Sequence, residues 1–261
     1  MIYFLAFFLP VLPAFSYIVG NFSEPTLYKN GAVFSEQYPI TFRTGYLSDY
    51  TYSTSMKDEF ITENSEKTDL GMTTYANITT INLCNRLDAY AILGSTKMQE
   101  NELGFVPRKF SWCVGGKAVL LQWGAYSFGI DGKYFETKQT PVYYVLDTGE
   151  PAFIQNNLDF TYSETQIAFG FSYIWDRVVG YLGATYLNAK LLPSPRFVVL
   201  DIPAIGEDSI YEDDNLRNNI NERPFGLVWG ITLLSEKTFS LNIESRHIDQ
   251  YEVNVSGLIR F

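Results

Sequence analysis

Histidine and cysteine are scarce in this chain, and their scarcity limits its chemistry. The 261 residues include only 1 His and 2 Cys, whereas structural zinc sites usually take four such ligands at characteristic spacings. We therefore expect no metal centre and no cofactor.

Basic residues are also few and are not clustered. The chain has 19 Lys and Arg against 29 Asp and Glu, which gives a net charge of -10. Nucleic-acid binding depends on attraction between clustered basic side chains and phosphates. We therefore exclude nucleic acid as a partner.

Long apolar runs are missing after the first 18 residues. The opening stretch, MIYFLAFFLPVLPAFSY, carries no charge before Glu24 and ends in the small-residue pattern Ala14-Phe15-Ser16. It predicts a secretory signal peptide over residues 1–16, with an uncleaved anchor as the alternative. Beyond it, no charge-free apolar stretch reaches the roughly 18 residues that a spanning helix needs. If residues 17–261 cross a membrane as one domain, they must cross it with strands.

Aromatic residues, by contrast, are abundant, and they alternate with small or polar ones. The chain has 20 Phe and 19 Tyr but only 18% charged residues. Strict alternation predicts strands that have one apolar and one polar face. Ten such segments occur, at about 41–53, 72–84, 87–96, 109–122, 126–134, 166–173, 178–190, 225–233, 239–246 and 252–261. The last has one exception, Leu258, which falls on the polar face.

Two all-β architectures produce this alternation: a soluble sandwich and a membrane barrel. The segments run to about ten to thirteen residues, which suits tilted membrane strands, because soluble strands average about five or six. Aromatic residues also gather near segment ends, where interfacial girdles lie in outer-membrane barrels; examples are Trp112, Trp123, Tyr173, Trp175 and Tyr251. We therefore predict a transmembrane antiparallel up-and-down β-barrel.

The connections between segments support this topology. Tight links near residues 85–86, 123, 176–177 and 236–237 alternate with long polar links over about 54–71, 97–108, 138–160 and 191–223. Bacterial barrels have short periplasmic turns and long outer loops. Segments 140–147, 152–158 and 196–201 fit either further membrane strands or extensions outside the membrane, so we expect 10–14 strands, with about 12 favoured.

Charged residues within the alternating segments fall on the polar face. A basic residue facing lipid near the bilayer midplane would cost roughly 2–4 kcal/mol, so these charges should face the lumen, meaning the interior of the barrel. The predicted pore-lining residues are Arg43, Lys117, Asp131, Lys133, Glu244, Arg246, Glu252 and Arg260. The alternative is that they pair across strands and fill a closed barrel.

Four other residues invite a chemical interpretation. Cys84 and Cys113 form a possible disulfide in an oxidising envelope, with two free thiols as the alternative. His247 beside Asp249 resembles an acid–base pair, but the sequence offers it no partnered nucleophile. We therefore expect a solvated rim histidine and no enzyme.

Several sequence blocks together resemble the chlamydial major outer membrane protein (MOMP) family, in a short form. The blocks are 20–27 (GNFSEPTL), 43–50 (RTGYLSDY), 85–94 (NRLDAYAILG), 110–118 (FSWCVGGKA) and the closing region 230–261. The resemblance implies a porin in the bacterial outer membrane, usually a homotrimer, inserted by a barrel-assembly machinery that recognises a terminal aromatic residue. Phe261 would then be the insertion signal. The chain is shorter and poorer in cysteine than typical members of that family.

Two functions follow as expectations. The first is a water-filled diffusion channel for small hydrophilic solutes and ions, surrounded by outer-membrane lipid. The alternative is a narrow or closed barrel that acts as a surface antigen, adhesin or structural envelope protein.

Overall fold

The computed structural model describes residues 20–28, 39–59, 68–100, 106–145, 151–201, 210–213, 216–235 and 238–261. The predicted signal peptide, 1–16, lies outside these residues. All ten segments predicted from alternation are strands. They are β1 (Ile40–Asp58), β2 (Thr68–Leu83), β3 (Leu87–Gln99), β4 (Lys109–Trp123), β5 (Tyr126–Gln139), β8 (Asp159–Trp175), β9 (Val178–Ser194), β13 (Phe225–Ser235), β14 (Phe239–His247) and β15 (Tyr251–Arg260).

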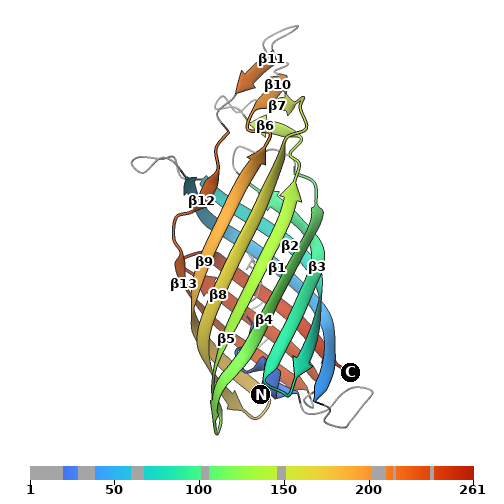
Figure 1. Ribbon diagram of the computed structural model, residues 1–261, viewed down its shortest axis with the longest axis vertical. Helices are drawn as coiled ribbons and strands as arrows, with labels where there is room; N and C mark the ends of the chain where they lie inside the picture. Colours follow the sequence, from blue (N-terminus) through green and yellow to red (C-terminus); the bar gives the residue numbers. More distant parts are fainter. Residues whose placement is uncertain are drawn as a thin grey trace, which may run out of the picture.

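These ten strands close into one antiparallel barrel, because β1 pairs with β2 on one side and with the last strand, β15, on the other. A short strand, β12 (Asn219–Asn221), bridges β1 and β9 at the upper end. Figure 1 shows the tilted strands and, at the lower end, the C-terminus and the short helix α1 (Glu24–Leu27). Closure leaves no unpaired edge in the wall, as a membrane-spanning sheet requires.

The strand count lies at the lower limit of the predicted range, two fewer than the favoured twelve. The ambiguous segments instead form a separate four-stranded sheet outside one end of the barrel. It contains β6 (Tyr143–Val145), β7 (Pro151–Ile154), β10 (Val198–Asp201) and β11 (Ile210–Asp213). These strands of three or four residues are too short to span a bilayer.

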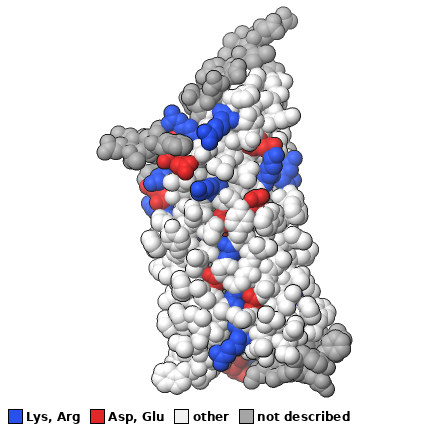
Figure 2. Space-filling model, in the orientation of Figure 1, with Lys and Arg blue, Asp and Glu red and all other residues white. Residues whose placement is uncertain are grey.

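The outer face of the wall is apolar, as the alternation predicts. On β8, Phe169 and Phe171 are 47% and 65% exposed, whereas the intervening residues are buried. Figure 2 shows a largely uncharged wall apart from a narrow column of coloured residues, with further charged residues gathered near the upper end. An outer face with so many exposed apolar side chains requires the hydrocarbon of a bilayer around it.

Three of the predicted tight links, near residues 85–86, 123 and 176–177, lie at the lower end, opposite the outer sheet; the fourth, 236–237, lies outside the described residues. Asn85 and Asp176 take positive φ angles of 52° and 51° there, a conformation that Asn and Asp tolerate better than most residues. Among the described residues, no helix is long and apolar enough to cross a membrane.

Candidate functional site: the occupied lumen

The eight residues predicted to line a pore all face the lumen, but they do not border open water. Each is at most 5% exposed. Side chains that lined a wide water-filled channel would keep much of their surface accessible. Here they are packed and paired at several levels.

The lower lumen is filled by residues 20–28, which we call the N-terminal plug. Its first contacts are polar: the backbone N–H of Gly20 donates to Glu244 Oε2 at 2.7 Å. Asn21 Nδ2 donates to Thr232 Oγ1 at 2.9 Å, and Ser172 Oγ donates to Asn21 Oδ1 at 2.9 Å. These contacts tie the plug to β8, β13 and β14, which lie on one side of the lumen.

Phe22 is fully buried against the wall, where three glycines leave room for its ring. Gly129, Gly170 and Gly183 are direct neighbours on β5, β8 and β9. A Cβ atom at any of the three positions would contact Phe22 more closely than packing allows. We call this surface the glycine seat. Tyr181 closes it with an edge-on contact, its ring centroid 6.0 Å from that of Phe22.

Ion pairs anchor the plug on the opposite wall. Glu24 accepts from Lys117 Nζ at 2.6 Å, and the same ammonium group lies 3.7 Å from Asp131. Arg43 pairs with Asp88 and lies 3.8 Å from Glu24. These contacts leave each buried charge close to an opposite one, which low-dielectric surroundings demand.

The electrostatics of Glu24 follow from these partners. Burial acts to raise the pKa of the Glu24 carboxyl, but the positive charges of Lys117 and Arg43 outweigh burial and lower that pKa below its ordinary value. Glu24 belongs to the plug and not to a spanning strand. It is therefore an anchor that holds best in its ionised form.

The last residues of the plug explain the apolar exception on the final strand. Leu27 and Tyr28 pack with Leu258 in one buried cluster. The Tyr28 hydroxyl also bonds to Ser240, and Arg260 donates to the Tyr28 carbonyl. Leu258 thus faces inward because it meets the plug. The alternation of apolar and polar residues does not by itself explain the inward position of Leu258.

A second group of charges fills the lumen above the plug. Lys133 lies 3.7 Å from Glu164. Arg246 pairs with Asp249 and lies 3.4 Å from Glu252. All of these side chains are at most 1% exposed. Ion pairs therefore fill this level of the lumen, as the closed-barrel alternative predicts.

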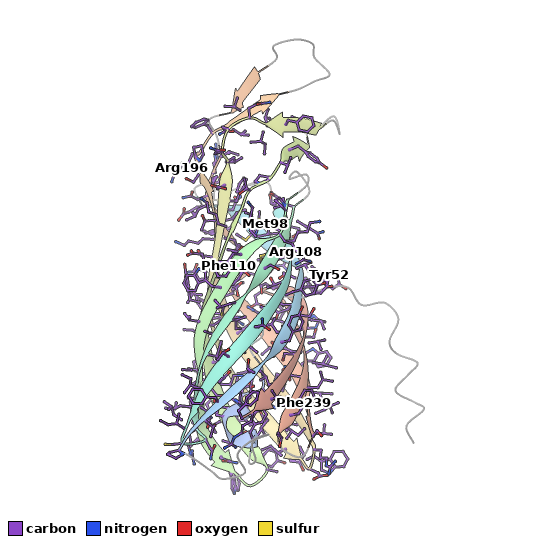
Figure 3. All side chains as sticks on the ribbon, turned by 90° about the vertical axis from the view of Figure 1, so that its right-hand side faces the viewer. Tyr52, Met98, Arg108, Phe110, Arg196 and Phe239 are labelled. Carbon is purple, nitrogen blue, oxygen red and sulfur yellow. The ribbon has the colours of Figure 1, made fainter. Side chains whose placement is uncertain are left out.

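The highest level of the interior is apolar. One buried cluster runs from the upper strands into the outer sheet; its members include Met56, Leu70, Met72, Met98, Phe160, Leu191, Val198 and Leu200. The labelled Met98 lies near the upper end of the barrel in Figure 3. A hydrated solute on the barrel axis would have to shed water to pass this layer.

One small cavity borders the plug in the lower lumen. A cavity of about 30 Å³ lies between the plug and the wall, bordered by Glu24, Asp88, Tyr90, Lys117 and Asn242 among others. That volume suffices for about one or two water molecules. Its polar lining could hydrogen-bond them.

The proposed disulfide is absent, since Cys84 and Cys113 are both free thiols. Cys84 lies in the lower turn, where Leu83 pairs with Leu87, whereas Cys113 pairs with Ile92 five residues farther along β3. Five residues of strand span roughly 17 Å, whereas bridged cysteines have Cα atoms less than about 7 Å apart. Of the two alternatives for these cysteines, the structure therefore has the free thiols and not the disulfide.

His247 and Asp249 do not form an acid–base pair. Asp249 points into the lumen, where it binds Arg246 and accepts from Thr185 at 2.7 Å. His247 lies on the outer wall, where its Nε2 is 3.0 Å from Ser245 Oγ. Ser245 was not predicted as a functional residue. The sequence spacing could have indicated it, because Ser245 and His247 are two residues apart on one strand and so have their side chains on the same face.

Phe261 follows the last strand and lies at the lower rim, 43% exposed. Its N–H donates to the Phe42 carbonyl at 3.0 Å, which fixes the chain end against β1. Its role as an insertion signal stays a prediction.

Comparison with protein-family models and with curated protein sequences finds no match. Among solved structures, the outer membrane protease OmpT from Escherichia coli is similar at 10% identity and a TM-score of 0.37, over 85% of this chain and 93% of that one. The transport unit of the autotransporter AIDA-I from Escherichia coli is similar at 12% identity and a TM-score of 0.32, over 92% and 95%. Likenesses this low do not assign a function to this chain.

Proposed function

We propose that this protein is a bacterial outer-membrane barrel that is closed in its resting state and acts at the cell surface through the part outside the bilayer. The observation that carries the proposal is the occupied lumen: a plug, a layer of paired charges and an apolar layer lie one above another. Each layer opposes the passage of hydrated solutes for a different physical reason. Of our two expectations, the geometry thus favours the closed barrel.

The outer sheet supports the proposal that the protein acts through the part that lies outside the bilayer. It continues the apolar cluster of the upper barrel, through Ala152, Val198 and Leu200. A sheet packed on the barrel in this way is held as a rigid platform, and rigid platforms suit recognition of other molecules. An adhesin or a structural envelope protein would use it.

A channel remains a second candidate, because the plug is attached largely through polar contacts. Hydrogen bonds and ion pairs in a partly wet lumen exchange with water at modest net cost. Withdrawal of residues 20–28 would uncover the polar lower lumen, though the apolar layer above would still have to move.

Swelling of liposomes in sugar solutions distinguishes these functions. We expect no solute-dependent swelling with the wild-type barrel or with a variant that lacks residues 20–28. Swelling with only the deletion variant would favour a plug-gated channel. Swelling with the wild type would support an open porin and overturn the closed barrel.

Membership of the chlamydial MOMP family, a homotrimeric assembly and insertion by the barrel-assembly machinery remain proposals that rest on the sequence resemblance. Chemical cross-linking of the protein in its native membrane tests the assembly. A ladder that ends at three subunits supports the trimer, and a monomer band alone contradicts it.

A further inference from the structure

A recess opens on the lipid-facing wall near the upper rim, away from the lumen. Its volume is about 350 Å³, and its walls are mainly Tyr52, Trp229, Ile243, His247, Tyr251 and Val253. The labelled Tyr52 points outward at the upper end of the barrel in Figure 3. The recess thus lies where acyl chains meet lipid head groups.

Ser245 forms the floor of this recess. It pairs directly with Trp229 on β13 and with Val253 on β15. Its side chain is much smaller than either neighbour, which leaves the depression between them. A single small residue in an otherwise bulky row therefore creates an apolar pocket with a hydroxyl group at its base.

The Ser245 hydroxyl group contacts the imidazole of His247. Ser245 Oγ lies 3.0 Å from His247 Nε2 and 2.9 Å from the Glu252 carbonyl oxygen. The imidazole lies between two rings: nearly parallel to Trp229, with 7° between planes, and edge-on to Tyr251. These rings restrict how the imidazole turns and keep Nε2 directed at the serine.

We propose that this recess is an acyl-ester site, with Ser245 as nucleophile and His247 as general base toward an ester-linked acyl chain of a membrane lipid. A hydroxyl within hydrogen-bond reach of a neutral imidazole nitrogen is the shared requirement of serine acyl-transfer catalysis. The apolar walls accept one acyl chain, and the position at the rim brings the ester group of that chain to Ser245. The proposal is independent of whether the lumen conducts.

The reaction is a hydrolysis and needs only water as co-reactant. Ser245 Oγ bonds to the ester carbonyl carbon while its proton moves to His247 Nε2. The carbon–oxygen bond to the alcohol then breaks, and Nε2 returns the proton to the leaving alkoxide. Water releases the acyl group by the reverse proton route, which yields a free fatty acid and restores the serine.

The resting hydrogen bond to Glu252 has a role in this scheme. One hydroxyl proton serves two acceptors, so Ser245 is unreactive while it donates to the Glu252 carbonyl. An ester carbonyl in the recess places an electrophile beside Oγ, and the proton must then pass to Nε2. We therefore expect slow turnover.

The test uses the refolded full chain in phospholipid micelles, with a long-chain alkyl fluorophosphonate as the probe. We expect covalent labelling at Ser245, located by peptide mass spectrometry, at least tenfold faster than with a short-chain probe. Ser245→Ala should abolish labelling, and His247→Ala should slow it at least tenfold. Release of labelled fatty acid from phospholipid should show the same pattern.

Ser48→Ala on β1 is the matched control and should label like the wild type. Val253→Trp, which fills the recess and leaves both Ser245 and His247 in the chain, should remove the advantage of the long chain. Folding of each variant is checked by heat-modifiable gel mobility. No labelling of a folded wild type, or labelling that His247→Ala leaves unchanged, overturns the proposal.

Discussion

Gly170 lies against the ring of Phe22 in the lumen wall, where a larger side chain would overlap that ring. Gly170→Val should therefore either strain the wall or displace the plug. Overpacking of a well-packed interior costs typically about 1–3 kcal/mol. We expect the free energy of unfolding, measured by urea titration in lipid vesicles, to fall by about that amount. Hydrogen exchange should also speed up over residues 20–28.

Gly180→Val is the control for this substitution. Gly180 is on β9, and a Cβ atom there meets nothing within 4 Å. Its variant should unfold like the wild type and keep the plug protected. Equal effects of the two valines would mean that Phe22 does not occupy the glycine seat.

Glu24 makes the attachment of the plug dependent on pH. Its pKa is lowered in the folded state from the ordinary value of 4.5. A lowered pKa contributes stability that is fully present above the unfolded value and is lost as pH falls through the folded value. We predict that residues 20–28 stay protected from hydrogen exchange above pH 4.5 and lose protection below it. Glu24→Gln should remove most of this pH dependence; unchanged dependence in that variant would contradict the assignment.

At the scale of single strands, the orientation of β8 is fixed by lipid on one side and packed polar groups on the other. Phe169 lies near the middle of the apolar band and is 47% exposed. Phe169→Arg would place a charge in hydrocarbon, at a cost of roughly 2–4 kcal/mol. Folding titrations into vesicles should show this loss. Thr161→Arg, on the same face but at the upper end of β8, should cost about 0–1 kcal/mol.

The strands were predictable because alternation is a local signal. Each of the ten segments carries its own apolar face, so the sequence indicates both the strand and the side that meets lipid. The strand number was less certain, because segments such as 140–147 alternate too briefly to distinguish a membrane strand from an outer one. Their length in the structure, three or four residues per strand, decides it.

The plug was not predictable in the same way. Residues 20–28 have no periodicity, and their binding surface is assembled from strands that include β1, β4, β5, β8, β9, β13, β14 and β15. Gly129 and Gly170 were visible as small residues on the polar face, but only the register of β5 against β8 makes them neighbours. The eight charged residues are buried in the lumen, and their pairing follows the closed-barrel alternative. The filling of the lower lumen by the plug was not predicted.

At the scale of the whole molecule, assembly should depend on the chain end more than stability does. Phe261 is partly exposed and makes one backbone hydrogen bond to β1. We expect deletion of Phe261 to lower the amount of membrane-inserted protein in cells severalfold, because the proposed insertion signal is this terminal aromatic residue. The free energy of unfolding of the purified barrel should change by less than about 1 kcal/mol.

Phe239→Ala tests whether the effect belongs to the chain end. Phe239 is exposed on the same lower part of the wall, as its label in Figure 3 shows. Its variant should insert normally. Equal insertion defects in the two variants would assign the effect to lost lipid contact and not to recognition of Phe261.

The strands of the barrel differ in length around its circumference. β8 and β9 have 17 residues each, whereas β13, β14 and β15 have 11, 9 and 10. Their lower ends are level, since Leu233 pairs with Val178. The upper ends of the three short strands therefore lie about seven residues below the upper end of β9, or roughly 18 Å at ~3.4 Å per residue and an inclination of about 40°. Above these short strands, β12 pairs with both β1 and β9 and continues the wall. Three residues thus close the gap between two long strands, and a molecule that approaches Ser245 from the cell surface must first pass them.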